Sequence, residues 1–168
     1  VRVGGFLLFN KALMSSATHL TLAEAALGYI NQGYSVIPIR TGSSQPKIPA
    51  IKWKRYQSQR PTPELIQTWF SISDRGLAII TGRVSGGLAV LDLDSQERFQ
   101  QFWEQFPDLC DTYIVQTKRG YHLYYQIPET LTTRTRQLPN MDWQWEGRYV
   151  VAPPTAGYRA ITSQHPRI

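Results

Sequence analysis

The stretch Leu88-Ala-Val-Leu-Asp-Leu-Asp-Ser95 decides the fold, because it is typical of a strand that ends at the start of a helix. Alternate residues of a strand point to opposite faces of a sheet. The apolar residues Ala89, Leu91 and Leu93 are therefore predicted to face a layer of helices. The other face carries two carboxylates, Asp92 and Asp94, which repel each other unless a cation lies between them.

Helix and strand signals of the same kind occupy most of the chain. Ser95 is a typical helix N-cap, and the helix after it has an aromatic stripe, Phe99, Phe102, Trp103 and Phe106, that is predicted to be core. Two earlier helices are expected to begin at the capping box Thr21–Glu24 and at Thr62-Pro63. Strands are expected at 34–38, 76–81, 88–94, 113–117, 121–127, 142–145, 149–152 and 158–161, with a polar loop over 128–140. The pattern predicts an α+β domain with a mixed or mostly antiparallel sheet and helices on one face.

The turn Thr117-Lys118-Arg119-Gly120 joins two of these strands and is followed by His122. Two cations, backbone N–H groups and a glycine that permits close approach suit a triphosphate. A single histidine on a strand is more often a hydrogen-bonded structural residue. The neighbouring turn is what favours a role for His122 in binding phosphate.

Asp142 is a candidate third carboxylate on another short strand. Glu146 is a competing candidate, but it falls in a turn and is more typical of a charged turn residue. Three carboxylates with basic groups nearby suit phosphoryl transfer by two divalent cations, Mg²⁺ or Mn²⁺. This chemistry alone does not separate a polymerase from a nuclease.

Length, charge and cysteine content limit the classes of protein. A chain of 168 residues is sufficient for one domain with a sizeable core. Eighteen Lys and Arg against twelve acids give a net charge of +6, which indicates either solubility alone or a polyanionic partner. The single Cys110 excludes an internal disulfide and a multi-cysteine zinc site, and it fits a cytoplasmic location.

The N-terminal residues 1–13 are interpreted as an upstream or non-native extension, because Met14 begins a segment that reads like a natural start. The longest apolar run, Gly5–Phe9, is too short to span a membrane, so no membrane partner is expected. Residues 14–168 are then expected to form one catalytic domain. The chain ends without a closing element, which is typical of the front part of a larger protein.

Seven pieces of the chain occur in an order that is found together in one known family. They are Ala26–Pro38, Lys47-Ile-Pro49 with Trp53, Trp69, Ile80-Thr81-Gly82, Leu91–Asp94, Thr117–Tyr125, and Asp142 with Gly147–Thr155. Over roughly residues 20–160 the chain resembles the bifunctional primase/polymerase (prim-pol) domain of the archaeo-eukaryotic primase superfamily. The resemblance implies an RRM-like catalytic sheet joined to an N-terminal α/β unit.

The resemblance also implies roles for individual residues. Asp92, Asp94 and Asp142 correspond to the catalytic metal ligands, and His122 to a histidine that contacts the phosphates of the incoming nucleotide. Further nucleotide-binding candidates are Thr117, Lys118, Arg119, Lys47 and Arg148. The family often has Arg and Gly after the third acid, where this chain has Gln144 and Trp145. Arg148 is the expected substitute for the missing arginine.

The implied function is a template-dependent nucleotidyltransferase, a DNA primase or DNA polymerase that uses NTPs or dNTPs with Mg²⁺ or Mn²⁺. Its expected partners are template and primer DNA and a fused or associated helicase or replication module of a mobile element. RNA or DNA synthesis, and initiation or extension, stay open. A metal-dependent nuclease is the first alternative, and a catalytically silent module that binds single strands is the second.

Overall fold

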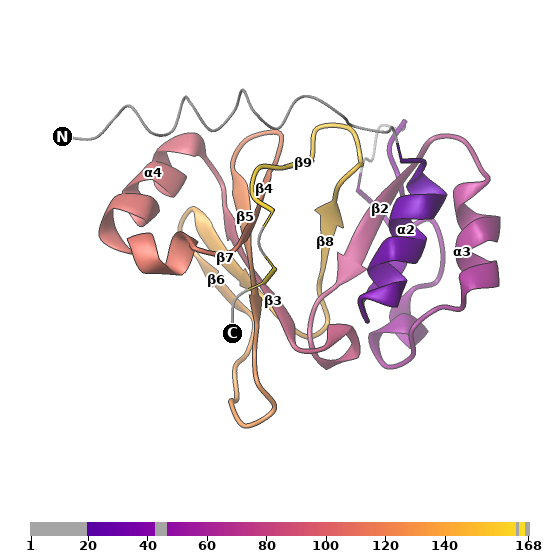
Figure 1. Cartoon of the computed structure of the whole chain (residues 1–168), viewed down its shortest axis with the longest axis horizontal. Helices are drawn as coiled ribbons and strands as arrows, with labels where there is room; N and C mark the ends of the chain where they lie inside the picture. Colours follow the sequence, from indigo (N-terminus) through magenta and orange to yellow (C-terminus); the bar gives the residue numbers. More distant parts are fainter. Residues whose placement is uncertain (1–19, 43–46, 164, 167–168) are drawn as a thin grey trace.

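The computed structural model describes residues 20–42, 47–163 and 165–166. The expected extension over residues 1–13 lies outside them. The described chain forms three α-helices and two antiparallel sheets, one of three strands and one of six. Figure 1 shows α4 at one end of the molecule and α2 and α3 at the other, with the strands between them. The expected α+β class is confirmed, and its strands form two antiparallel sheets.

The small sheet has the order β1-β2-β8, with β1 at Ser35–Arg40, β2 at Arg75–Ile80 and β8 at Tyr149–Ala152. Helices α2 (Leu22–Asn31) and α3 (Pro63–Phe70) pack beside it, and a 3₁₀ turn, η1 (Lys54–Gln57), precedes α3. The predicted starts of both helices are confirmed. Thr21 and Glu24 form a complete capping box at α2, and the Thr62 hydroxyl accepts a hydrogen bond from the N–H of Leu65 at α3.

The large sheet has the order β6-β7-β3-β5-β4-β9. Its strands are β3 (Leu88–Leu93), β4 (Tyr113–Gln116), β5 (Tyr121–Gln126), β6 (Arg136–Leu138), β7 (Met141–Gln144) and β9 (Arg159–Ala160). Two further 3₁₀ turns are η2 (Arg83–Ser85) and η3 (Pro107–Cys110). Strand β6 lies in the segment that was expected to be only a polar loop, where it pairs with β7.

Helix α4 (Gln96–Gln105) covers one face of the large sheet, as the strand pattern predicts. Leu91 and Leu93 of β3 join Phe99 of α4 in one buried cluster, and the Ser95 hydroxyl caps the helix. The prediction that the whole aromatic stripe is core is wrong for its second half. Trp103 and Phe106 are 39% and 42% exposed, because the apolar side of the helix extends past its buried contacts.

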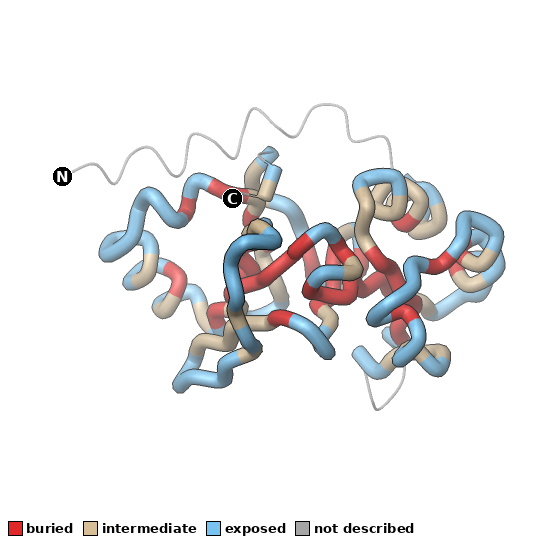
Figure 2. The backbone as a smooth tube through the Cα atoms, turned by 90° about the horizontal axis from the view of Figure 1, so that it is seen from below, coloured by how far each residue is buried: buried red, intermediate tan, exposed pale blue. Residues whose placement is uncertain are grey.

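The main core fills the space between the two sheets and extends to α2 and α3. Figure 2 shows the buried backbone gathered in the middle of the molecule. Val90 and Tyr124 of the large sheet share this core with Ile79 and Val150 of the small one. The large sheet is thus buried on both faces, by α4 on one and by the small sheet on the other. Polar side chains of β3, β5 and β7 gather at the edge of the contact between the large sheet and the small sheet.

The link from β7 to β8 joins the two sheets. Both strands were predicted around Glu146-Gly147-Arg148, but β7 pairs with β3 while β8 pairs with β2. Trp145 anchors the crossing: it is buried, and its carbonyl accepts a hydrogen bond from the Thr81 hydroxyl. Gly147 has φ +76°, a conformation that favours glycine. The crossing carries Arg148 to the junction of the sheets.

Among the described residues, no helix has both the length and the apolar character needed to cross a membrane.

Candidate active site

A row of three functional side chains crosses the middle of the large sheet. In the strand register, Asp92 of β3 lies directly opposite His122 of β5 on one side and opposite Asp142 of β7 on the other. Residues directly opposite each other in antiparallel strands point to the same face, with Cβ atoms about 4.5–5.5 Å apart. The two acids and the histidine therefore form a continuous polar row on the face that meets the small sheet.

Asp92 and His122 are in contact within this row. The Nε2 atom of His122 lies 3.4 Å from Oδ1 of Asp92. The histidine side chain is only 7% exposed and that of Asp92 is 30% exposed, so the acid is the more accessible of the two. The rings of Tyr158 and Tyr124 lie 6.0 and 6.3 Å from the imidazole, centroid to centroid. This packing fixes the His122 ring while one edge of it reaches the site.

Asp142 has a polar neighbour but forms no ion pair with any residue that the structure describes. The Gln144 amide donates a hydrogen bond of 3.4 Å to Oδ2 of Asp142, and within the described ranges no Lys or Arg forms an ion pair with this acid. Like charges directly opposite each other on neighbouring strands destabilise a sheet. Asp92 and Asp142 therefore form a negatively charged pair that a bound cation would stabilise.

A pocket of about 330 Å³ opens beside this row, and it extends from the large sheet to the small one. It is lined by Asp92, His122 and Gln144 from the large sheet, by Gly147, Arg148, Tyr149, Val150 and Val151 from the crossing and β8, and by Lys47, Trp53 and Tyr158. Two cations, Lys47 and Arg148, thus line the same pocket as one acid and one histidine.

The backbone of Lys47 is held at the pocket by Tyr149 of β8, a strand of the small sheet. Its φ is +74°, and its carbonyl accepts a hydrogen bond of 3.1 Å from the Tyr149 hydroxyl. Trp53 packs edge-on against Tyr149 at 5.0 Å between centroids. The Lys47 ammonium lies 5.8 Å from the centroid of the Tyr158 ring, a cation–π distance. The lysine is therefore directed toward the same wall that holds His122.

Asp94 lies one residue beyond β3, and its carboxylate faces the turn after β4. Arg119 lies 3.9 Å from it, with side chains 81% and 46% exposed for Arg119 and Asp94. Exposed pairs of this kind are worth at most about 1 kcal/mol. Asp94 is thus held only weakly in this position.

Two backbone N–H groups of the turn at residues 117–120 are hydrogen-bonded within the turn itself. The Thr117 hydroxyl accepts hydrogen bonds from the N–H groups of Arg119 (3.3 Å) and Gly120 (3.0 Å). These N–H groups were expected from the sequence to bind the triphosphate, but here they are already donated to the Thr117 hydroxyl. Lys118 lies with its aliphatic chain against Gly157. Any phosphate contact from this turn would come from the side chains of Lys118 and Arg119.

The candidate residues from the sequence thus divide into two groups. Asp92, His122, Lys47 and Arg148 line one pocket, and Asp142 lies next to Asp92. Asp94, Thr117, Lys118 and Arg119 lie around the neighbouring turn and are not among the pocket residues. Four pocket residues with polar groups were not predicted from the sequence: Trp53, Gln144, Tyr149 and Tyr158. Strand alternation puts Gln144 on the same face as Asp142. Trp53 and Tyr149 lie in pieces of the chain that carry the family resemblance, and no pattern singled out Tyr158.

The donor atoms of the site suit a hard divalent cation. Mg²⁺ and Mn²⁺ prefer carboxylate oxygens, and Asp92 and Asp142 supply them side by side. In the described residues, no group of three or more His, Cys, Asp and Glu is gathered tightly enough to hold a metal ion. The chemistry of the acid pair fits a divalent cation, and Asp94 is the nearest further carboxylate along the strand.

Comparison with known protein families identifies the class. Residues 26–167 match the family described as Prim-Pol, bifunctional DNA primase/polymerase, N-terminal. The chain belongs to this family of nucleotidyltransferases, whose activity is DNA priming and polymerisation. DNA and nucleotides are the substrates that the family description implies. A search of curated protein sequences gave no match.

Proposed function

We propose that this domain is a template-dependent nucleotidyltransferase whose chemistry takes place at the row Asp142–Asp92–His122. The observation that carries the proposal is the strand register, in which Asp92 is the direct partner of both other residues. Lys47 and Arg148 supply positive charge in the pocket that Asp92 also lines. An acid that can hold metal and two cations in one pocket suit a nucleotide triphosphate, whose phosphates can contact both.

Asp92 and Asp142 are the residues that would hold divalent metal, with Asp94 as a third ligand. Asp94 is two residues from Asp92 along the strand direction, and its exposed pair with Arg119 costs little to break. When bound, Mg²⁺ or Mn²⁺ lowers the pKa of an attacking hydroxyl and neutralises charge on the phosphates. Of these three acids, Asp92 lines the pocket itself, and Asp142 lies directly opposite it on the neighbouring strand.

The cations and His122 would bind and position the phosphates. Lys47 acts as a point charge on a fixed backbone, and Arg148 offers a planar guanidinium that can form two parallel hydrogen bonds. Arg148 then replaces the arginine that the family often carries at the position of Gln144. His122 is held in place by Asp92 and Tyr158, so that its exposed edge offers a rigid contact.

Template DNA would lie along the basic surface outside the pocket. The net charge of +6 favours a polyanionic partner, and Lys118 and Arg119 are exposed next to the acid row. We further propose that the domain works beside a fused or associated helicase or replication module, as the family resemblance suggests.

Incubation with a labelled primer on a longer template, dNTPs and Mn²⁺ tests the proposal. Extension of the primer by template-directed steps supports it. Shortening of the primer would instead assign the same acids to a nuclease, and binding without any change in length would indicate a silent binding module. Omission of dNTP is the control, because a nuclease acts without it and a polymerase does not.

A further inference from the structure

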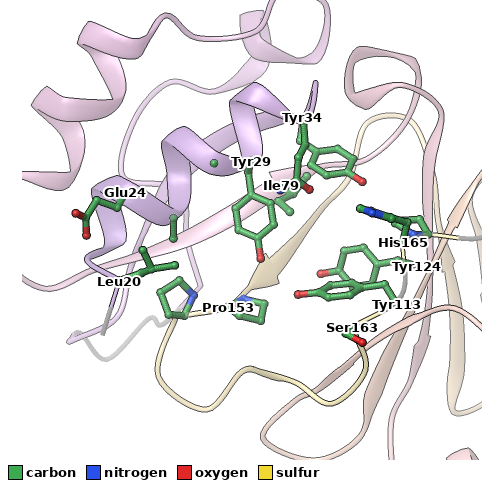
Figure 3. Close-up of a pocket in the computed structure, with 15 residues that line it drawn as sticks. Leu20, Glu24, Tyr29, Tyr34, Ile79, Tyr113, Tyr124, Pro153, Ser163 and His165 are labelled. Carbon is green, nitrogen blue, oxygen red and sulfur yellow. The ribbon is translucent and has the colours of Figure 1, made fainter. Parts of the chain in front are cut away.

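A second and larger cavity, of about 560 Å³, lies apart from the acid row. It is bounded by α2, by β4 and β5 of the large sheet, and by the segment after β8, through Pro153, Pro154, Ser163 and His165 (Figure 3). Its volume is within the range of sites that hold small ligands. None of its residues is an acid of the proposed catalytic row.

Four tyrosines dominate the lining of this cavity, which we call the tyrosine pocket. They are Tyr29 of α2, Tyr34 just before β1, Tyr113 of β4 and Tyr124 of β5. In Figure 3, Tyr29, Tyr113 and Tyr124 turn their hydroxyl groups toward one another from three different elements. Three of the rings are only half buried, so aromatic surface faces the cavity. Aromatic surface of this kind stacks on flat rings.

The charges of the residues that line the tyrosine pocket indicate whether a charged or an uncharged part of a ligand would bind there. Among the described residues that line the pocket, none is a lysine or arginine, and Glu24 is the one acid. Burial raises the pKa of all four phenols, which keeps them neutral. A phosphate would therefore find no lysine or arginine in the described part of this lining. The entering group is therefore uncharged, flat and able to form hydrogen bonds.

Tyr124 supplies an unused hydrogen-bonding group. Its ring is 2% exposed, and its hydroxyl has no hydrogen-bond partner in the described part of the chain. A buried polar group without a partner is unfavourable. The Tyr29 and Tyr113 hydroxyls lie beside it and interact with each other. A ligand with donors and acceptors along one edge would complete this group of phenols.

Strand β5 contributes one residue to the proposed catalytic row and another to the tyrosine pocket. His122 and Tyr124 are two residues apart on this strand and point to the same face, about 7 Å apart along it. A single strand of DNA that passes the row could therefore present one base to the pocket while its phosphates stay on the basic surface.

We propose that the tyrosine pocket binds one unpaired nucleobase of single-stranded DNA. The proposal rests on the proposed function only in its choice of DNA as the partner. Binding is measured without dNTP or metal, so that a failure here is distinct from a failure of catalysis. Stacking on aromatic side chains tolerates any base, so no sequence preference is required.

The test measures the affinity for a labelled thymidine oligonucleotide of about 10 nucleotides by fluorescence anisotropy. Tyr29→Leu removes an aromatic face but keeps apolar bulk, and it is expected to weaken binding about fivefold or more. Tyr124→Phe removes only the unpartnered hydroxyl and is expected to weaken binding about two- to tenfold. An oligonucleotide of equal length with abasic sites should bind all forms alike.

Tyr125→Leu is the matched control, because Tyr125 lies on the opposite face of β5, next to Trp143. Its affinity should stay within about twofold of the original. Urea denaturation of each variant confirms that it is folded.

Three results would overturn the proposal. Tyr29→Leu and Tyr124→Phe could both bind as the original does. They could lose affinity equally for the abasic strand, which would assign the effect to backbone binding. Free thymidine could compete as strongly as the oligonucleotide, which would assign the pocket to a free nucleoside.

Discussion

The substitution Gly120→Ala tests how the turn after β4 is held against the end of β3. A Cβ atom at this position would lie 1.8 Å from the Leu93 carbonyl oxygen, 2.7 Å from the Ser95 nitrogen and 2.8 Å from the Asp94 carbonyl carbon. All three are backbone atoms, which cannot turn aside as a side chain can. Gly120 is required for this close approach and not for its φ, since it is not among the residues with positive φ.

The loss of stability expected for Gly120→Ala follows from how closely the added Cβ atom would approach these backbone atoms. The carbonyl oxygen must move from 1.8 Å to at least 3.4 Å, a shift of about 1.6 Å, before the contact becomes ordinary. Overpacking of this kind costs about 1–3 kcal/mol and occasionally more. The turn also contains the hydrogen bond from the Thr117 N–H to the Gly120 carbonyl, at 2.9 Å. We expect the free energy of unfolding to fall by about 3 kcal/mol, which lowers Tm by about 6–12 °C.

Urea denaturation followed by circular dichroism measures the change, and Gly28→Ala is the matched control. Gly28 is inside α2, and a Cβ atom there meets nothing within 4 Å. Alanine should raise the stability of this helix by about 0.5–1 kcal/mol. If Gly120→Ala changes the free energy of unfolding by less than about 0.5 kcal/mol, the turn is not packed as described.

Three further predictions concern nucleotide, DNA and thiol chemistry. His122→Ala should raise the KM for dNTP while leaving a cooperative urea transition, and loss of that transition with no separate effect on KM would assign His122 a structural role. The logarithm of the affinity for single-stranded DNA should fall with a slope of about −2 to −3 against the logarithm of salt concentration, as three or four phosphate contacts require. An affinity that does not change with salt would show that the cations only contact solvent. Cys110 should react slowly with thiol reagents at pH 8, because burial raises the pKa of its thiol to about 11, and rapid labelling of the native protein would contradict this.

The starts of the helices and the two faces of the strands could be predicted from the sequence, because they depend on residues close together in the chain. The capping box at Thr21, the cap at Ser95 and the alternation along Leu88–Leu93 each depend on neighbours a few residues away. For the same reason, the face of Asp92 and the face of His122 could each be predicted. That the two lie directly opposite each other could not, because strand register is set by partners distant in sequence.

The division into two sheets depends on such distant contacts. Strand β8 pairs with β2, about seventy residues earlier in the chain, and the pattern of neither strand specifies the other. This pairing brings Tyr149, whose hydroxyl bonds the Lys47 carbonyl, to the acid row. Lys47 and Arg148 could be named from the family resemblance, but their position beside Asp92 could not be predicted from local signals. Helical periodicity likewise gives the apolar side of α4, but not how much of its length is covered, which explains the exposure of Trp103 and Phe106.

The most direct test of the central claim compares primer extension by Asp92→Asn and Asp142→Asn with extension by the unchanged protein. Asp74→Asn is the control, because Asp74 is exposed and has φ +57°, a conformation that asparagine adopts readily. Loss of groups that support metal ligands lowers activity about 10- to 100-fold, so loss of a ligand itself should cost about a hundredfold or more. We predict this loss for Asp92→Asn and Asp142→Asn, with unchanged affinity for DNA, and full activity for Asp74→Asn. Normal extension by Asp92→Asn would contradict the assignment of the active site to this row.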